Sequence, residues 1–511
     1  MLSILIGLPL FGSLVLGLWP KKLDGKWVRW SAVAVMSAAL IWSIVVLLHF
    51  DLNATGMQLS EYVPWIQPLG LSYSLGMDGL SLPLILLTNL LSWVVIVGGV
   101  GKIMGHDTST PPDRSRLFYV LVLLVNAGVT GGLLAQNLLL FIICYELELI
   151  PFYLLIVIWG GKQREYAATK FLIYTAISGV IILVAFLAMG WLGEFSSFDY
   201  GDIESKVSGL PQITQLVLLT LLIIGFGIKV PFVPLHSWLP DAYVEASSPV
   251  AILLGGVLSK LGTYGLVRFC LGLFPETWAL VSPGLSILAA VCVAYGSITA
   301  IAQKDIKRMV AYSSIGHMGY VLLGMIALTP LALVGAISQM VSHGLILALL
   351  FYLVGIIEAK VGTRELNVLN GLLNPLRGLP SISALLIFGG MASAGIPGLI
   401  GFIAEFMVFQ GSFQTFPIPT LLCVITSGLT AVYFIIMINR TCFGKLDNYT
   451  AYYPKVTWSE QLPALILSGL ILFLGVQPTW VVRWSEKTAA TMVIATVPGV
   501  EQQVALDSTP P

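Results

Sequence analysis

The chain has 511 residues, of which 57% are hydrophobic and 10% charged, and its formal net charge is zero. A water-soluble domain carries about 25% charged residues. These charges are too few to solvate a globule of this size, so most of its surface must face lipid. The zero net charge argues against nucleic-acid binding. The composition therefore predicts a membrane protein.

Fourteen segments have enough apolar residues to cross the membrane as a helix, which needs about 20 residues. They are 2–19, 30–49, 79–101, 117–135, 137–158, 171–192, 212–246, 249–271, 281–302, 309–328, 333–357, 379–413, 419–439 and 461–480. The first has no basic region before it, so we expect a retained span rather than a cleaved signal. The predicted fold class is an all-α polytopic membrane protein with about fourteen transmembrane helices.

Two of these spans are too long for one straight helix, and each contains residues that break helices. The seventh holds Lys229-Val230-Pro231, and the twelfth holds Gly395-Ile396-Pro397-Gly398. Proline removes a backbone hydrogen bond and glycine weakens a helix. We therefore expect both spans to be discontinuous.

The basic residues predict the orientation of the chain. One set of alternate connections holds 19 of the 25 basic residues, and the other holds four, Lys206, Arg268, Arg483 and Lys487. Because basic loops face the cytoplasm, both termini are predicted to lie on the non-cytoplasmic side. The stretch 481–511 is interpreted as a tail. The two remaining basic residues, Lys229 and Lys260, fall inside predicted spans.

Six titratable residues on six different spans lie at similar predicted depth in the membrane. They are Glu146, Lys229, Lys260, His317, His343 and Glu405. A charge near the bilayer centre costs about 2.5–3.5 kcal/mol on insertion scales, and charged residues are scarce in this chain. Such a layer favours a proton pathway over structural pairing, although a lone buried histidine or a single Glu–Lys pair is often only structural.

Proton movement suits the chemistry of these residues. Burial disfavours the charged form of both lysine and glutamate, which brings each closer to exchanging its proton, and histidine titrates near neutral pH. We expect Glu146 and Lys229 to form a pair whose separation would release the proton of the lysine. We also expect Lys260 to have no permanent carboxylate partner. Glu148, Asp241, Glu245, Arg164 and Lys170 are interpreted as an entry funnel or a solvated cytoplasmic face.

The two broken spans lie five spans apart, which predicts two inverted five-helix repeats. The expected organisation is three N-terminal spans in 1–116, a first repeat in 117–271, a second repeat in 281–439, and a last span with a tail in 461–511. No metal or cofactor site is expected in this chain. Its five cysteines are scattered without grouped spacing, and no glycine-rich nucleotide fingerprint follows a strand.

Several motifs, in order, resemble the antiporter-like subunits of respiratory complex I across spans four to thirteen. They are Tyr145-Glu146-Leu147-Glu148-Leu149-Ile150-Pro151, Lys229-Val230-Pro231, His236-Ser237-Trp238-Leu239-Pro240-Asp241-Ala242, Ser259-Lys260-Leu261-Gly262 with Tyr264-Gly265, Tyr312 to Gly319, Ser342-His343-Gly344, and Gly401 to Phe406. The acidic Glu405 and the short C-terminal segment are similar to the chain 4 type. The residues at the motif positions resemble those of cyanobacterial or plastid members of the family.

The resemblance implies a subunit of an NAD(P)H- or ferredoxin-dependent quinone oxidoreductase that couples quinone reduction to proton pumping. It implies that Glu146 is the essential carboxylate, Lys229 its partner and Lys260 the central relay. His317 and His343 would continue the relay, and Glu405 would be the exit residue. Flavin or ferredoxin, iron–sulfur clusters and plastoquinone would be used by partner subunits, which would include further antiporter-like chains, so this chain would be a translocase subunit without a redox centre.

One residue departs from the motifs of that family. Relatives usually have histidine after Pro240-Asp241-Ala242, whereas this chain has Tyr243. The residues through which protons enter are therefore not identified by the resemblance. The tyrosine fits a divergent paralogue, such as one serving carbon dioxide uptake. Two other functions compatible with the residues are a stand-alone or Mrp-type cation/proton antiporter and a membrane scaffold that transports nothing.

Overall fold

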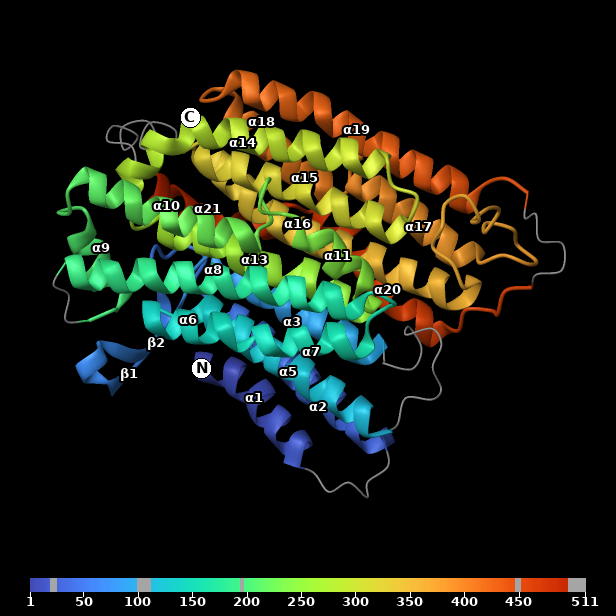
Figure 1. Ribbon diagram of the computed structural model, residues 1–511, viewed down its shortest axis with the longest axis horizontal. Coiled ribbons are helices and arrows are strands. Elements are labelled where there is room, and N and C mark those ends of the chain that lie inside the picture. The colour runs from blue at the N-terminus through green and yellow to red at the C-terminus, as the bar shows by residue number, and fades with distance from the viewer. Residues whose placement is uncertain (19–24, 99–111, 194–196, 446–451, 495–511) are drawn as a thin grey trace.

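The computed structural model describes residues 1–18, 25–98, 112–193, 197–445 and 452–494. Long apolar helices lie side by side and form one bundle (Figure 1). Within the described residues, twelve helical segments are long and apolar enough to cross a membrane. They are α2 (Gly25–His49), α3 (Ser81–Gly98), α5 (Pro112–Leu134), α6 with α7 (Leu138–Leu147, Leu149–Trp159), α8 (Arg164–Leu192), α10 (Gln212–Lys229), the segment α12, η2, α13 and η3 (Ser248–Leu253, Leu254–Leu258, Ser259–Gly265, Leu266–Leu271), α14 (Pro275–Ile301), α15 (Ile306–Ile326), α16 (Pro330–Val361), α19 (Pro417–Cys442) and α20 (Trp458–Val476).

Three shorter apolar helices occupy the other two expected spans. The first is α1 (Leu2–Leu18), and the second span is divided between α17 (Pro380–Ser393) and α18 (Ile400–Phe413). The remaining elements are short or lie outside these spans. They are β1 (Gln58–Ile66), η1 (Gln67–Leu69), β2 (Leu71–Met77), α9 (Tyr200–Val207), α11 (Trp238–Glu245) and α21 (Thr479–Ile494).

The helices break at both predicted places. The seventh span stops at Lys229 and resumes as α11 at Trp238. The twelfth is interrupted between Ser393 and Ile400, where Gly395 and Gly398 have φ of +73° and +91°. Residues with a side chain rarely adopt this backbone conformation, so glycine is favoured there.

The fifth span contains a further break that was not expected. Helix α6 ends at Leu147 and α7 begins at Leu149, which leaves Glu148 at the junction. The reason lies in Pro151, which has no amide hydrogen to donate to the carbonyl of Leu147, four residues earlier.

Two segments differ from the all-helical expectation and from the expected tail. Strands β1 and β2 form an antiparallel hairpin between the second and third spans, at the left end of the helices in Figure 1, near α9. Part of the expected tail forms helix α21, which packs against the bundle, and Thr488 there accepts a 3.0 Å hydrogen bond from the amide of Gly79. The segment 479–494 is less apolar than any of the spans, so this helix depends on its tertiary contacts.

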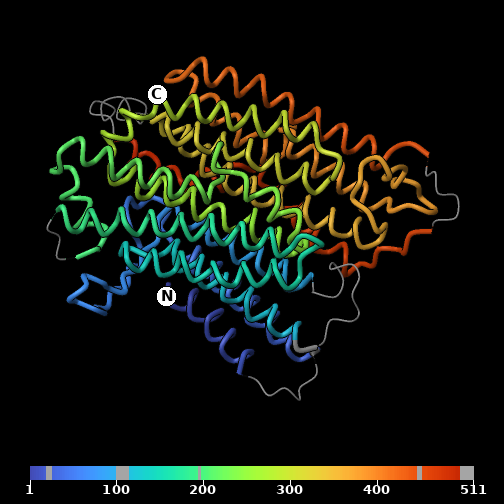
Figure 2. The backbone as a smooth tube through the Cα atoms, viewed as in Figure 1, coloured from blue at the N-terminus to red at the C-terminus, as the bar shows by residue number. Residues whose placement is uncertain are grey.

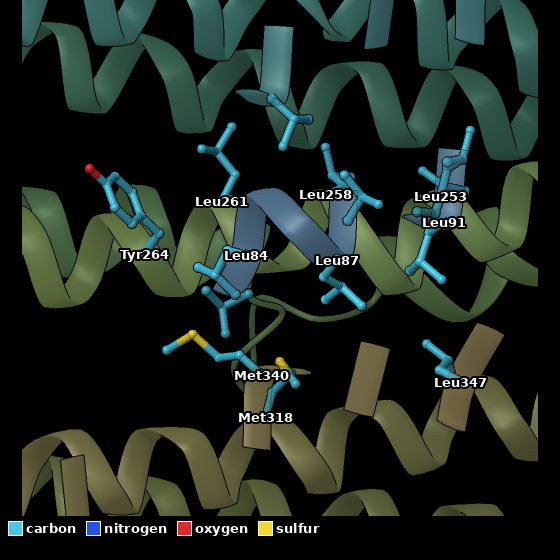
Figure 3. Packing of buried hydrophobic residues seen from close by; sticks show 14 of the residues in the cluster. Leu84, Leu87, Leu91, Leu253, Leu258, Leu261, Tyr264, Met318, Met340 and Leu347 are labelled. Atoms are coloured by element: carbon cyan, nitrogen blue, oxygen red, sulfur yellow. The ribbon is translucent and has the colours of Figure 1, made fainter. Parts of the chain in front are cut away.

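The blue segments lie along one long edge of the bundle and the orange segments along the other, and the red C-terminal segment lies between them (Figure 2). At the centre, leucines of α3, among them Leu87 and Leu91, lie between the Lys260-containing span and α16 (Figure 3). Gly256 and Gly344 allow this close packing. A Cβ atom on Gly344 would lie 3.2 Å from the carbonyl oxygen of Gly256 and 2.6 Å from Leu87.

Two basic residues that were assigned to loops are buried instead. Lys307 is 1% exposed and donates a hydrogen bond to the carbonyl of Ala246, and Arg268 is 3% exposed. Each lies at the end of an otherwise apolar helix, so sequence position alone does not distinguish it from a loop residue. Buried basic residues are therefore not limited to Lys229 and Lys260.

Candidate functional site

Lys229 lies at the last position of α10, where the seventh span breaks, and its ion pair is with Glu148 rather than with Glu146. Both members of the pair are buried. The expected Glu146–Lys229 pair is thus corrected, and Glu148 is not a residue of a solvated cytoplasmic face. The break before Pro151 places Glu148 at the junction of α6 and α7, facing the interior of the bundle.

Aromatic and polar groups fix the position of Lys229. Its ammonium group lies 3.2 Å from the centre of the Tyr145 ring, a cation–π contact. The Tyr145 hydroxyl lies 2.9 Å from Ser178 Oγ, which donates a 2.7 Å bond to the carbonyl of Gly225. The ring is therefore held between α6, α8 and α10.

Glu146 is half-buried on the side of α8. A Cβ atom on Gly179 would fall 1.6 Å from Glu146 Oε1, so the carboxylate lies where any larger residue would place its side chain. Glu146 and Glu148 both line a narrow gap with Lys229. Lys229 attracts the Glu146 carboxylate electrostatically.

Lys260 is buried at the centre of the eighth span and contacts no carboxylate among the described residues. Its ammonium group lies 2.5 Å from His343 Nδ1 and donates to the carbonyl of Gly255 at 2.6 Å. When Lys260 is an ammonium group it can only donate, so Nδ1 of His343 then accepts and Nε2 carries the proton of a neutral ring. That Nε2 atom is buried and has no hydrogen-bond partner in the described chain.

His317 lies between His343 and Glu405 of the twelfth span. The ring centres of His317 and His343 lie 5.6 Å apart. His317 Nδ1 lies 3.5 Å from Glu405 Oε1 and 3.3 Å from the amide nitrogen of Gln339, and its Nε2 lies 3.1 Å from Ser393 Oγ. A neutral Nδ1 can accept a bond from the Gln339 amide, whereas a protonated Nδ1 can pair with Glu405.

A small cavity with both polar and apolar lining residues lies among these side chains. Its lining includes His317, Gln339, His343, Ser393 and Glu405. Two atoms of this group, His343 Nε2 and Gln339 Oε1, are buried without a partner in the described residues. Buried polar groups of this kind are usually satisfied by ordered water, so the cavity suits water-mediated proton transfer.

The structure thus brings four of the six predicted site residues into one line, Lys260, His343, His317 and Glu405. Lys229 lies beside that line without a hydrogen bond to Lys260 among the described residues. The two helices nevertheless pack closely, because a Cβ atom on Gly262 would lie 3.4 Å from the Cβ atom of Lys229. Glu146 stands at the outer edge of the arrangement. Every member of the line can accept and release a proton.

Ion pairs occupy the end of the bundle that the basic loops assign to the cytoplasm. Asp241 binds Lys170 at 2.8 Å and Arg308 at 3.1 Å. Tyr243 is buried and donates a 3.1 Å hydrogen bond to the carbonyl of Leu254. Among the described residues of the expected entry funnel, only Asp241 and Lys170 pair with each other. Tyr243 packs inside the protein next to Gly255, whose carbonyl accepts from Lys260.

A second buried ion pair joins the start of the third span to the end of the eighth. Arg268 binds Asp78 at 2.5 Å, and its Nε donates to the hydroxyl of Tyr264 at 3.3 Å. Sequence reasoning left Asp78 unassigned and missed this pair, because the partners are 190 residues apart. Glu148 was detectable in principle, since Pro151 marks a break in the fifth span beside it.

A bundle of apolar helices with broken spans and a buried line of titratable side chains defines a membrane protein of the ion-translocating class. The chain belongs to the family of NADH:quinone oxidoreductase and Mrp antiporter membrane subunits, whose model matches residues 135–430, more than half of the chain. The matched region contains all six predicted site residues.

Curated relatives cover nearly the whole chain. A protein of Synechococcus sp. (strain JA-2-3B'a(2-13)), called NAD(P)H-quinone oxidoreductase chain 4 1, is 40% identical over 93% of this chain and 89% of its own. A protein of Synechocystis sp. (strain ATCC 27184 / PCC 6803 / Kazusa), called NAD(P)H-quinone oxidoreductase chain 4-2, is 41% identical over 87% of this chain and 78% of its own. The expected resemblance to the chain 4 type is confirmed.

Solved structures share the fold. A chain of respiratory complex I from Thermus thermophilus with bound NADH superposes with a TM-score of 0.86 at 26% identity, covering 97% of this chain and all of that one. A chain of the Mrp complex from Dietzia sp. DQ12-45-1b has a TM-score of 0.84 at 20% identity and covers 99% of both chains. The second likeness concerns the fold alone.

Proposed function

We infer that this chain is a proton-translocating membrane subunit of an NAD(P)H-quinone oxidoreductase complex. Its family membership, its 40% identity to a chain 4 subunit over 93% of its length, and its fold support this function. Within the complex it acts as a translocase component. Its partners are the other membrane subunits and those that oxidise the donor and reduce quinone.

The observation that carries the proton pathway is the buried line from Lys260 through His343 and His317 to Glu405. Lys260 passes a proton to Nδ1 of His343, which releases one from Nε2 toward the cavity. His317 receives it and hands it to Glu405, beside the break of the twelfth span. Lys229 and its carboxylates control the charge at the other end of this line.

No cofactor is assigned to this chain in this proposal. The relay uses side-chain protons alone, and electron transfer takes place in partner subunits. The relatives are cyanobacterial, which favours a thylakoid membrane as the location. The basic loops favour non-cytoplasmic termini.

Lys260→Met tests the relay in assembled complexes within sealed membrane vesicles. The substitution removes the proton-carrying group, keeps an apolar stem, and removes a buried charge. Because positioned acid–base groups contribute about 10²-fold or more to proton transfer, we expect coupled proton uptake to fall at least about tenfold. The amount of assembled complex should stay close to that of the wild type. Normal proton uptake in the variant would contradict the pathway.

The same vesicles distinguish an Mrp-type antiporter, which the family description also includes. In that case a sodium gradient alone, without an electron donor, would drive proton movement through the chain. We expect no sodium-driven movement and full dependence on quinone reduction.

A further inference from the structure

Lys229 has two carboxylates within reach, although an ion pair needs only one. Glu148 binds its ammonium group through Oε1, and Oε2 of the same carboxylate is buried without a partner. Glu146 lines the same gap, two residues earlier. Residues two apart on a regular helix point to nearly opposite sides. Both side chains nevertheless line the gap around Lys229, and Glu148 lies at the junction of α6 and α7.

The three groups cannot all be charged at low cost. Two carboxylates close together repel each other, and burial penalises any uncompensated charge. The favoured state of the group is neutral overall, with one ammonium, one carboxylate and one protonated carboxyl. With Lys229 on Glu148, the protonated carboxyl is Glu146. The state in which Glu148 carries the proton and Lys229 pairs with Glu146 has the same net charge.

We propose that Glu146 and Glu148 are alternative counter-charges of Lys229, so that Glu148 is a second functional carboxylate of the fifth span. When the proton of Glu146 moves to Glu148, one O–H bond breaks and another forms. Lys229 keeps its three protons and moves its ion pair to Glu146. This inference deepens the proposed function and rests on it.

The surroundings of Lys229 suit such an exchange. Its ammonium group lies over the Tyr145 ring, whose face attracts a cation without holding it at one oxygen. Tyr145 itself is anchored through Ser178 to the carbonyl of Gly225. The ring is thus a fixed surface across which the ammonium group can move between two carboxylates, which follow Tyr145 by one and three residues.

Single and double substitutions test the proposal in assembled complexes in sealed vesicles. In Glu146→Gln, Lys229 remains locked on Glu148, and in Glu148→Gln it remains locked on Glu146. Each single variant should therefore lose coupled proton uptake at least about tenfold, with assembly retained because one carboxylate still balances the lysine. The double variant should lose assembly as well, since it leaves a buried lysine unpaired.

The outcome separates this inference from the pathway itself. If Glu148→Gln pumps normally while Lys260→Met does not, the relay stands and the two-carboxylate exchange is overturned. If Glu146→Gln alone pumps normally, Glu148 is the only counter-charge and the exchange is again wrong. Infrared difference spectra during turnover add a readout that a structural role would not change. Carboxyl bands of opposite sign are expected, and both should vanish in either single variant.

Gly179→Ala tests the same idea without removing any titratable group. Its new Cβ atom would take the place of Glu146 Oε1 and push the carboxylate out of the gap. We expect it to impair proton uptake as Glu146→Gln does, even if a glutamine variant fails to assemble. Gly284→Ala is the matched control, because a Cβ atom there meets nothing within 4 Å. Wild-type pumping in Gly179→Ala would contradict a role for the placed Glu146 carboxylate.

Discussion

Substitution of Lys260 tests the chemistry of the proposed pathway most directly. It is buried, binds a histidine nitrogen and a backbone carbonyl, and contacts no carboxylate in the described residues. A fixed structural cation at this depth would be expected to bind an acid. Its contact with His343 Nδ1 instead suits a group that gives up its proton, because a neutral amine and a neutral imidazole can share one hydrogen bond.

Lys260→Arg distinguishes a proton carrier from a fixed charge. Guanidinium keeps its proton at all relevant pH values, so the variant retains the charge and the hydrogen-bond donors but cannot release a proton. We expect coupled proton uptake to fall at least about tenfold, as in Lys260→Met. Proton uptake and quinone reduction are measured together in assembled complexes. An arginine variant that pumps like the wild type would show that Lys260 is a fixed charge.

At the scale of single elements, the break in the fifth span decides which acid meets Lys229. Pro151 prevents a hydrogen bond to the Leu147 carbonyl, and Glu148 lies at the resulting junction. The broken seventh and twelfth spans have the same effect, since they place Lys229 at a helix end and Gly395 against Glu405 Oε2. Irregular backbone inside a membrane is tolerated where it lines a polar interior.

Pro151→Ala should restore the missing hydrogen bond and join α6 to α7. The chain should become as stable as the wild type or more so, because proline within a helix costs about 3 kcal/mol. Proton uptake should nevertheless fall, because closing the junction shifts Glu148 relative to Lys229, with which it forms an ion pair. Thermal unfolding and proton uptake are measured on the same preparations. Pro283→Ala, at an exposed proline inside α14, is the control and should leave proton uptake unchanged.

Helix packing around α16 depends on glycine at the point where Lys260 reaches His343. Gly344→Ala would bring a Cβ atom to 2.6 Å from Leu87 and 3.2 Å from the Gly256 carbonyl. Overpacking of this kind costs about 1–3 kcal/mol, so we expect a lower unfolding temperature and weaker proton uptake. Gly428→Ala in α19 meets nothing within 4 Å and should be neutral or stabilising by up to about 1 kcal/mol. Equal effects of the two substitutions would contradict the packing argument.

At the scale of the whole molecule, ion pairs at the two ends of the bundle differ in burial, since Asp78–Arg268 is buried and the pairs of Asp241 are partly exposed. The Asp78–Arg268 pair lies near one end of the first half, and Asp241 binds Lys170 and Arg308 near the other. Between them, the line from Lys260 to Glu405 runs from the eighth span to the twelfth across the middle of the bundle. In the proposed pathway, a proton passes from the eighth span to the twelfth inside the molecule, rather than along one helix.

Cysteine labelling tests which end of this bundle faces the cytoplasm. Thr55 and Lys445 are exposed and lie in connections that an odd number of spans separates. We expect Lys445→Cys to react with an impermeant thiol reagent only from the cytoplasmic side, and Thr55→Cys only from the other side. The unsubstituted chain is the control, since four of its five cysteines are buried and Cys144 is half-buried. Labelling of both positions from one side would contradict the span assignment.

Much of this architecture follows from residue order alone, because a bilayer selects for length and apolarity along the chain. The spans, the breaks at Pro231 and Gly395 to Gly398, and the depth of the six titratable residues all depend on local sequence. The family can also be predicted from the sequence, since short motifs such as Tyr145 to Pro151 are typical of it. Neither the hairpin β1–β2 nor α21 is readable in this way, because both depend on packing against the bundle.

Only the tertiary structure decided which side chains meet. Choosing between Glu146 and Glu148 as the partner of Lys229 requires knowing which way each points at a helix break, and a shift of two residues reverses the direction. The Lys260–His343 contact depends on glycines that bring two spans together, and Asp78 meets Arg268 across 190 residues. Sequence determines how deep a charge lies in the membrane, whereas its partner depends on rotation and approach of helices distant along the chain.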